Sequence, residues 1–424
     1  MKKIYLYLLA CIGVLFTGCT QAFDNLSEAT DVKYISVDVK VNIDVKDLES
    51  LSNLVVRLDN YEEDLHYSVK TTEENVLVEN VLPGIYTVSV SGSGLDNVGF
   101  EYVLNGSLVN VALTEDCQPM TIDLLGLKKS SLIFKELYFA GCRTATNGTY
   151  FKDNYYEVYN NSESTVYLDG MHMTCLAPTR ATTKLPVWPE EDGNKYAYGD
   201  RVWKVPGNGT DYPLQPGESV VFALFGANHQ LEIYNPKSPV NLANAEFEFH
   251  FGHVNYPDMP ALNMEHVYYN GQSEITSGMQ WLCSVFGPAM VIFRVPEGET
   301  WDPMNDPNLS TTDLSKPTSK TLYVKIPIEY VLDAVECGDN ETYINAKRVP
   351  AVLDAGIAWV GATYCGLSIT RRFETDENGN PVINSHGAHV YMDTNNSTDD
   401  FEHGVVPEVR RHGAKMPSWN HSLN

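Results

Sequence analysis

Hydrophobic and polar residues alternate from Tyr34 onward. The apolar positions are Val37, Val39, Val41, Ile43 and Val45, and the polar positions between them are Asp38, Lys40, Asn42, Asp44 and Lys46. Because successive side chains of an extended chain point to opposite faces, this pattern predicts a strand with one buried and one solvated face. Further apolar runs follow at 54–58, 76–81, 85–90, 100–104 and 120–125, with turn residues between them. Their spacing predicts a small antiparallel β-sandwich over residues 34–127.

A second series of extended runs begins after residues 128–131, which we interpret as a domain boundary. The runs lie at 132–138, 155–159, 165–168, 219–225, 246–251, 267–269, 290–294, 328–334, 358–360, 365–373 and 389–393. Extended runs outnumber any segment with the period of a helix, so the predicted fold class is all-β. A second domain over residues 131–424 is long enough that insertions must sit between its strands.

Two runs at the centre of the second series flank a polar turn. Residues 155–160 and 165–170 are rich in aromatic and β-branched side chains, and the turn between them reads AsnAsnSerGluSer. Short runs of this composition around a polar turn predict a β-hairpin.

This predicted hairpin and its neighbours resemble a bacterial lamin-tail domain. The resemblance rests on a Tyr-x-Glu-x-Tyr-Asn strand at 155–160, a Val-x-Leu-x-Gly strand at 166–170 and a Pro-Gly-Glu turn at 216–218. It implies a larger immunoglobulin-like β-sandwich with loop insertions, a module that binds or supports rather than catalyses. In the first series, residues 81–90 resemble the Pro-Gly-x-Tyr strand of carboxypeptidase-regulatory-like domains, which implies a spacer sandwich.

The first 19 residues have the features of a lipoprotein signal. Lys2 and Lys3 precede an apolar run over 4–16 that is too short to span a bilayer, and ThrGlyCys follows at 17–19. The predicted signal spans residues 1–18. Its end, at Gly18 before Cys19, resembles a lipobox, which implies cleavage before Cys19 and a diacylglyceryl anchor on its sulfur. An ordinary signal peptide with a chance cysteine is the alternative. Residues 19–33 are polar and acidic and predict a flexible tether, whose acids resemble the surface-export signal of Bacteroidetes lipoproteins.

The order of these parts resembles a family of Bacteroidetes proteins that carries only a domain-of-unknown-function label. Segments that support this are LeuAspAlaGly at 353–356, SerIleThrArgArg at 368–372 and AspThrAsnAsnSerThrAspAspPhe at 393–401. The resemblance implies an outer-membrane lipoprotein, often encoded beside TonB-dependent receptors. Its expected partner is therefore an outer-membrane β-barrel receptor or another surface protein, and the resemblance supplies no catalytic residues.

Acidic residues outnumber basic ones by 55 to 29, which gives a net charge of −26. Phosphates would be repelled by such a surface, so nucleic acid and anionic membranes are excluded as partners of the protein body. The charge suits a soluble surface, or one that attracts cations or basic partners.

Six cysteines remain beyond the signal peptide and Cys19, namely Cys117, Cys142, Cys175, Cys283, Cys337 and Cys365. In an exported protein they could form disulfides, or stay buried as free thiols. Cys142 and Cys175 bracket the predicted hairpin, and Cys337 and Cys365 each follow a predicted strand, so these are the first pairings that we expect. The absence of a Cys-x-x-Cys pair argues against a zinc ribbon and a thioredoxin-like site.

Two clusters are candidate metal sites. PheHisPheGlyHis places His250 and His253 near Asp258, Glu265 and His266, and imidazoles suit transition metals. In a strand, however, His250 and His253 would point to opposite faces, and structural or exposed histidines are the alternative. Oxygen ligands at Asp393, Asn395, Ser397 and Asp399 have the spacing of a calcium loop, but the central Gly and distal Glu are missing. Capping of turns is the alternative role.

Aromatic residues gather in the insertion at 177–212. They are Trp188, Tyr196, Tyr198, Trp203 and Tyr212. On a loop such side chains can stack on sugar rings or rim a protein interface, or they can pack the insertion onto the sandwich, as we expect of Trp203.

The function that these observations favour is a non-enzymatic outer-membrane lipoprotein that binds a ligand or partner, as an accessory of a TonB-dependent uptake system. The sequence lacks the Gly-x-Ser-x-Gly motif that carries the nucleophile of many hydrolases. A surface adhesin that binds glycans through the aromatic insertion is the alternative, and a metal-dependent hydrolase that uses His250, His253 and His266 is a further one. No cofactor is expected, apart from the calcium or transition-metal ion that these clusters leave open.

Overall fold

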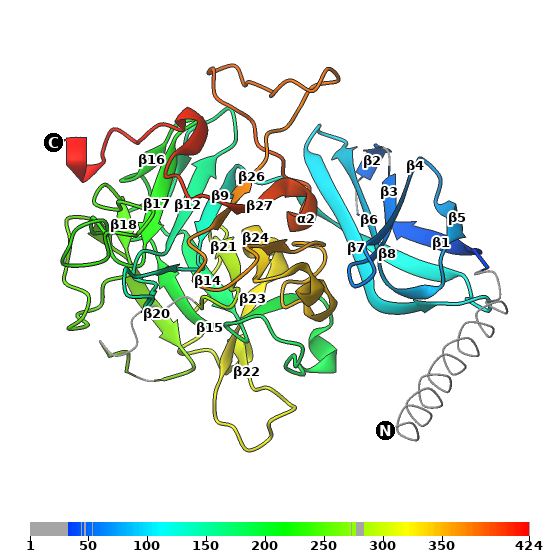
Figure 1. Cartoon of the computed structure of the whole chain (residues 1–424), viewed down its shortest axis with the longest axis horizontal. Coiled ribbons are helices and arrows are strands. Elements are labelled where there is room, and N and C mark those ends of the chain that lie inside the picture. Colours follow the sequence, from blue (N-terminus) through cyan, green and yellow to red (C-terminus); the bar gives the residue numbers. More distant parts are fainter. Residues whose placement is uncertain are drawn as a thin grey trace, which may run out of the picture.

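The computed structural model describes residues 33–43, 45, 48–52, 54–272, 274–276 and 284–423. Nearly all regular structure in this part is β-strand, arranged in several sheets that form two bodies side by side (Figure 1). The predicted all-β class is therefore confirmed. The predicted signal peptide, Cys19, the tether up to residue 32 and Cys283 lie outside the described residues. No helix in the described part of the chain is both long and apolar enough to cross a membrane.

The first body is one connected eight-stranded sheet, drawn in blue and cyan in Figure 1. Its strands are β1 (Ile35–Ile43), β2 (Leu48–Leu51), β3 (Leu54–Asn60), β4 (Leu65–Thr71), β5 (Asn75–Val81), β6 (Gly84–Asp96), β7 (Glu101–Leu113) and β8 (Met120–Lys128). They lie in the order β4-β3-β6-β7-β8-β1-β5, with β2 on β6. All pairings are antiparallel except that of β1 with β8, which is parallel. The end strands β4 and β5 contact each other, so the sheet curls around its own core.

The predicted alternation in β1 is confirmed. Its residues are buried and exposed in turn from Ile35 to Asn42. The buried side chains of the body form one core that includes Val37, Val41, Leu58 and Tyr86. The sequence analysis predicted neither β2 nor β4. In β4, polar residues alternate with apolar ones that are only partly buried, so the strand has no strongly apolar run that would mark it in the sequence.

The second body contains two large sheets. One has the order β19-β18-β17-β12-β9-β26-β27, and the other has the order β22-β23-β15-β14-β21-β24-β25, with β20 on β15. The first comprises β9 (Leu132–Tyr138), β12 (Tyr155–Asn160), β17 (Ser219–Ala223), β18 (Phe247–Glu248), β19 (Leu262–Asn263), β26 (Ser368–Arg371) and β27 (Phe401–Val405). The second comprises β14 (His172–Leu176), β15 (Tyr196–Lys204), β20 (Glu265–Tyr269), β21 (Ala289–Phe293), β22 (Ser310–Thr311), β23 (Tyr323–Pro327), β24 (Val331–Gly338) and β25 (Ala358–Trp359).

The remaining elements of the second body are short. Two small ladders pair β10 (Cys142–Arg143) with β11 (Thr149–Tyr150) and β13 (Val166–Tyr167) with β16 (Pro213–Leu214). The helical turns are η2 (Glu190–Asp192), η4 (Pro307–Leu309), η5 (Ile328–Tyr330), η6 (Glu341–Ala346), α2 (Ser397–Asp400), η7 (Arg411–Gly413) and η8 (His421–Leu423).

One core lies between the two large sheets of the second body. Phe134 and Tyr156 contribute from the first sheet, and Met173, Trp203 and Ile292 contribute from the second. Every residue of β9 and of β12 is buried, so the outer face of the first sheet is covered as well. The C-terminal segment provides part of that cover.

The C-terminal segment 406–423 is held against the first sheet by carboxylates of the strands. Arg411 Nε donates to Glu136 of β9 at 3.1 Å, and the Arg410 backbone N–H donates to Glu157 of β12 at 3.0 Å. These buried carboxylates explain why polar positions occur in strands that have no solvated face.

The predicted hairpin at 155–170 is wrong. The strand β12 is central and pairs with β9 on one side and β17 on the other, so no edge is left for the run that follows it. That run forms β13, which pairs with β16 instead. The polar turn is organised by Asn160, whose Nδ2 donates to Ser164 O and Leu214 O, both at 2.8 Å.

The two bodies are docked through polar and apolar contacts. Asn105 Nδ2 of β7 donates to Thr394 O at 2.8 Å, and Arg57 of β3 forms an ion pair with Asp399 of α2. Leu125 and Leu127 of β8 pack against the core that lies on the far side of the second sheet. Residues more than 250 positions apart are thereby brought together along one boundary.

Candidate functional site

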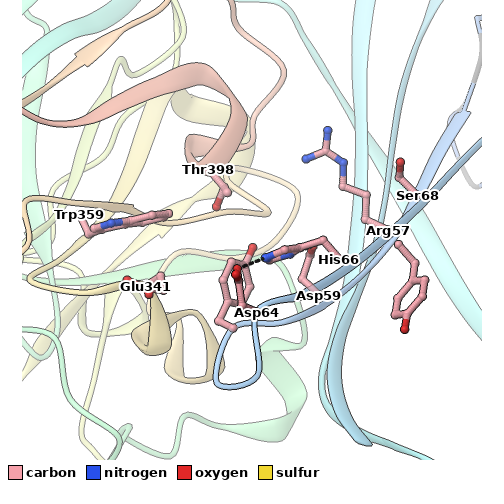
Figure 2. A pocket seen from close by; sticks show the side chains of 10 residues that line it. Arg57, Asp59, Asp64, His66, Ser68, Glu341, Trp359 and Thr398 are labelled. Atoms are coloured by element: carbon pink, nitrogen blue, oxygen red, sulfur yellow. Dashed lines mark hydrogen bonds and ion pairs between the residues drawn. The ribbon is translucent and has the colours of Figure 1, made fainter. Parts of the chain in front are cut away.

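A cavity of about 370 Å³ lies at the boundary between the two bodies (Figure 2). One wall comes from β3, β4 and the turn between them, and the other comes from η6, β25 and α2. The lining residues are Arg57, Asp59, Tyr61, Asp64, His66, Tyr67, Ser68, Glu341, Trp359 and Thr398. None of these was predicted as a site residue.

The imidazole of His66 is held between two carboxylates. The β3–β4 register places Asp59 opposite His66, and Nδ1 lies 2.8 Å from an Asp59 oxygen. Nε2 lies 3.3 Å from Asp64, which stands in the turn with a left-handed backbone (φ 54°). Partial burial opposes the charged ring, but the hydrogen bonds and charges of the two carboxylates outweigh it and raise the pKa of His66 above 6.5.

Arg57 and Asp399 connect the two walls of the cavity. Their ion pair links β3 to α2, and both side chains are partly exposed, at 32% and 22%. Burial works against the charge of Arg57, but the Asp399 carboxylate raises its pKa. Tyr61 and Thr398 line the cavity from opposite sides of the same boundary.

The opposite wall presents the indole of Trp359. His403 stacks on this ring with centroids 3.7 Å apart and an interplanar angle of 7°. His403 Nε2 lies 3.2 Å from Thr398 O, and Nδ1 accepts from the Trp359 backbone N–H at 3.3 Å, so the tautomer and the ring plane are both defined. Burial lowers the pKa of His403 to about 4 and keeps the ring neutral. One face of Trp359 is therefore occupied, and only the other side of the ring is left for a ligand.

The cavity is rich in acidic groups. Both ring nitrogens of His66 already contact a carboxylate, Nδ1 that of Asp59 and Nε2 that of Asp64. Asp59, Asp64 and Glu341 bring three carboxylates, whereas the guanidinium of Arg57 is already paired with Asp399. The excess of negative charge disfavours anionic ligands.

The predicted aromatic insertion divides between the surface and the core. Tyr196, Tyr198 and Trp203 lie on β15, a strand in the second sheet, so this part is not a loop. Trp203 is fully buried, as the alternative interpretation expected. Tyr212 packs on Phe247 and Trp419 in a different region.

Three of the five predicted aromatic residues do meet in a smaller pocket of about 200 Å³. Trp188, Tyr196 and Tyr198 line it, and Trp188 stacks on Tyr198 with centroids 4.2 Å apart. Arg348 also lines it, but its guanidinium donates to Glu336 and to three backbone carbonyls. This pocket therefore has an aromatic wall but no free charge from Arg348.

The three histidines predicted as metal ligands do not converge. His266 lies on β20 and stacks flat on Trp203 at 4.1 Å, and burial lowers its pKa to about 4. His253 Nδ1 accepts from the Asn255 backbone N–H at 3.1 Å. Asp258 of the predicted cluster does stand beside His250, and the third member of this group is Glu248, which was not predicted.

The predicted calcium loop is a polar junction in which the expected ligand oxygens make separate contacts. Asp393 accepts from Arg371 at 3.2 Å, whereas Asp399 pairs with Arg57 of the other body. Asn395 donates to Val352 O at 3.2 Å, and Ser397 hydroxyl donates to Asp354. The segment does provide a cap, which was the alternative role, because Asn396 caps α2 by accepting from the Thr398 backbone N–H.

The predicted disulfide pairings are not formed. Cys142 is a free thiol beside Asp153, and Cys175 is a free thiol near Leu176 O and Thr179 O. Cys365 is also free, so it is not joined to Cys337. Burial raises the pKa of Cys142 and that of Cys175 to about 12, which fits unreactive core residues.

Comparisons with known proteins identify relatives but no activity. The family model described as "Protein of unknown function (DUF4876)" matches residues 215–408. The chain is similar to a protein described as a DUF4876 family protein from Bacteroides thetaiotaomicron VPI-5482, whose crystal structure was determined at 2.50 Å resolution. The two are 58% identical with a TM-score of 0.70, over 92% of this chain and 100% of that one. No curated protein matches.

Proposed function

The chain belongs to the DUF4876 family of unknown function, and from its own residues we propose that it is a non-enzymatic binding protein whose ligand occupies the cavity between the two bodies. The observation that carries the proposal is the composition of that cavity. An indole face stands opposite a cluster of hydrogen-bonding side chains, and the two come from different bodies. A ligand held there touches both walls at once.

The ligand class that fits best is a small neutral saccharide. The indole of Trp359 offers an apolar surface for the C–H face of a sugar ring. The carboxylates of Asp59, Asp64 and Glu341 accept from hydroxyl groups, and Ser68 and Thr398 can donate or accept. The volume of about 370 Å³ lies at the small end of the range of roughly 300–1,000 Å³ for ligand pockets.

The cellular setting of the proposal comes from the sequence. A lipid on Cys19 would attach the protein to the outer membrane, next to an outer-membrane receptor of a TonB-dependent system. We further propose that the first body is carboxypeptidase-regulatory-like and the second is a lamin-tail-like sandwich. The first body would then be more than a spacer, because β3, β4 and the turn between them supply seven of the ten residues that line the cavity.

The test of the binding site is calorimetric titration of the mature protein with a panel of neutral mono- and disaccharides. The Trp359→Ala variant should raise Kd at least tenfold, because it removes the stacking surface. Trp188→Ala is the matched control, since it removes an aromatic wall from the smaller pocket and should leave Kd unchanged. If Trp188→Ala abolishes binding and Trp359→Ala does not, the aromatic insertion is the site and the cavity proposal is wrong. The absence of binding by any saccharide at millimolar concentration would also contradict it.

The test of the anchor is membrane fractionation of cells that express the Cys19→Ala variant. The wild-type protein should sediment with outer membranes, and the variant should be released into the soluble fraction. Equal sedimentation of both proteins would contradict a lipid on Cys19.

A further inference from the structure

Three side chains near the edge of the first large sheet form a group that the cavity does not involve. Glu248 ends β18, and His250 and Asp258 stand on the turn that follows it. One carboxylate oxygen of each acid and one ring nitrogen of His250 all lie within 4.8 Å of one another. Glu248 is buried, His250 is half-buried and Asp258 is exposed, so the group is enclosed on the side of Glu248 and open to solvent on the side of Asp258.

His250 is held in the tautomer that a metal ligand needs. Nδ1 lies 3.0 Å from the Tyr256 carbonyl oxygen, to which it donates its proton. Nε2 is therefore unprotonated, and its single lone pair accepts a hydrogen bond of 3.2 Å from the Gly252 backbone N–H, which a metal ion on Nε2 would displace. Histidines that bind metals usually donate their second N–H to a backbone carbonyl or a carboxylate in this way, because that bond fixes the ring.

The two carboxylates are also oriented by second contacts. Glu248 accepts from the Met259 backbone N–H at 2.8 Å with Oε1 and from the Gly226 backbone N–H at 2.9 Å with Oε2. Asp258 accepts from Asn263 Nδ2 at 3.0 Å. Each oxygen retains a further lone pair.

No ion pair within the described residues neutralises either acid. The nearby ammonium of Lys152 donates to Asn255 O at 2.9 Å and lies over the Tyr256 ring. A cation between the two carboxylates would supply the opposite charge that both acids lack.

We propose that Glu248, His250 and Asp258 bind one divalent transition-metal ion of the Zn²⁺ type, through Nε2 of the imidazole and one oxygen of each carboxylate. An imidazole with two carboxylates suits such ions better than Mg²⁺ or Ca²⁺, which prefer all-oxygen sites. Three protein ligands leave a coordination position for water or for a group of a partner.

The spacing of the three ligand atoms is compatible with one ion. Ligands about 2.1 Å from a tetrahedral ion stand roughly 3.4 Å apart, which lies inside the 4.8 Å within which these atoms are found. Glu248 is fixed by backbone N–H groups, so any adjustment on binding would fall to His250 and Asp258. The ion would thus attach the turn at 250–259 to the edge of the sheet.

The experiment strips the purified full-length protein with a chelator, titrates it with Zn²⁺ and counts the bound ion after dialysis. One equivalent should be retained, and His250→Ala should lose it. His253→Ala is the matched control, because this histidine lies three residues away on the same turn and takes no part in the group. Asp258→Asn keeps the shape of an exposed side chain, so it tests the site even if His250→Ala fails to fold, and it should weaken Zn²⁺ binding at least tenfold.

Several outcomes would overturn the proposal. They are the absence of stoichiometric Zn²⁺ in the wild-type protein, retention of the ion by both His250→Ala and Asp258→Asn, and loss of the ion in His253→Ala. The site is independent of the cavity, so saccharide binding and metal binding can each fail without the other.

Discussion

The two bodies differ in how deeply their ion pairs are buried. Among the described residues of the first body, most ionic side chains lie at the surface, as in the pair of Lys33 and Glu115, whose side chains are 75% and 61% exposed, and Asp96 is the one buried acid. In the second body, Lys135 and Glu157 form a pair that is fully buried, and Arg371 is 2% exposed among three aspartates. The first body is therefore stabilised mainly by its hydrophobic core, whereas the second also depends on buried charges that must all keep their partners.

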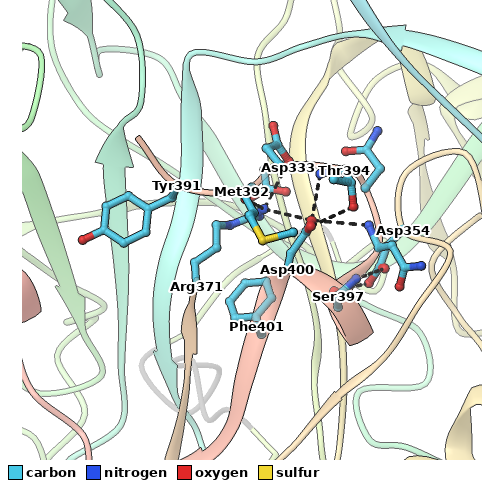
Figure 3. A network of polar contacts seen from close by, with 12 residues as sticks. Asp333, Asp354, Arg371, Tyr391, Met392, Thr394, Ser397, Asp400 and Phe401 are labelled. Atoms are coloured by element: carbon cyan, nitrogen blue, oxygen red, sulfur yellow. Dashed lines mark hydrogen bonds and ion pairs between the residues drawn. The ribbon is translucent and has the colours of Figure 1, made fainter. Parts of the chain in front are cut away.

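The largest expected effect is the removal of the guanidinium at the centre of the second body. Arg371 donates to Asp333 at 2.7 Å and to Asp393 and Asp400 at 3.2 and 3.3 Å (Figure 3). In Arg371→Met these carboxylates lose their common cation, so the free energy of unfolding should fall by about 3–5 kcal/mol. Urea denaturation measures this. Lys40→Met on the exposed face of β1 is the control and should stay within about 0.5 kcal/mol of wild type. Equal effects of the two substitutions would break the comparison between the bodies.

A cavity in the first core should have the next largest effect. Leu58 of β3 is fully buried among the apolar side chains of the first body. Leu58→Ala should lower the free energy of unfolding by about 2–4 kcal/mol, since the lost contacts are only partly recovered by collapse. Leu77→Ala is the matched control, because Leu77 is 49% exposed. The same denaturation experiment applies, and a loss below 1 kcal/mol for Leu58→Ala would show that the first core is loosely packed.

The pH dependence of stability should distinguish the second body. Burial and the charge of Asp393 raise the pKa of Asp400 to about 7, against the attraction of Arg371. The folded protein then holds a proton that the unfolded chain releases near pH 4, so this contribution to stability is full at low pH and is lost as the pH rises toward 7.

The Asp400→Asn variant tests this sign. Asparagine is neutral throughout, so the stability of wild type relative to the variant should decrease between pH 5 and 7, by at most about 1.4 kcal/mol per pH unit. Unfolding curves of both proteins across that range provide the measurement. A difference that grows with pH would mean that Asp400 is a stabilised carboxylate, and the buried network would then be fully ionised.

The smallest expected effect lies at the boundary between the bodies. Arg57→Gln breaks the ion pair with Asp399, and because both side chains are partly exposed, the loss should be about 1 kcal/mol or less. Salt should reduce the difference from wild type, since it screens such a pair. Lys70→Gln, on the exposed face of β4, is the control. An effect of Arg57→Gln that is insensitive to salt would show that docking depends on packing and not on this charge.

The comparison also explains which strands were predictable. The strand β1 alternates because one face is solvated, and β9 was predicted with its observed ends because all seven of its residues lie in a dense extended run. By contrast, β15 was taken for part of a loop, because Gly199 and the charged pair Asp200 and Arg201 interrupt its pattern. Their charges are satisfied by each other in the folded protein, at 3.1 Å.

Pairing partners were less predictable than strands. The period of an extended chain indicates which side chains share a face, but it does not identify the neighbouring strand. For this reason the run after Asn160 was expected beside β12, although β12 already has a partner on each side. The cysteine pairings failed for the same reason, since they were inferred from positions along the chain.

Sequence alone established the all-β class, the alternation of β1, the acidic charge and the resemblance to a Bacteroidetes family of unknown function, because each depends on composition or on local order. It also drew attention to His250. Only the tertiary structure joined His66 and Trp359 across nearly 300 residues, and only it replaced His253 and His266 by Glu248 as neighbours of His250. The physical reason is that a site requires side chains to converge in space, and convergence depends on how strands pair and bodies dock, which no local pattern contains.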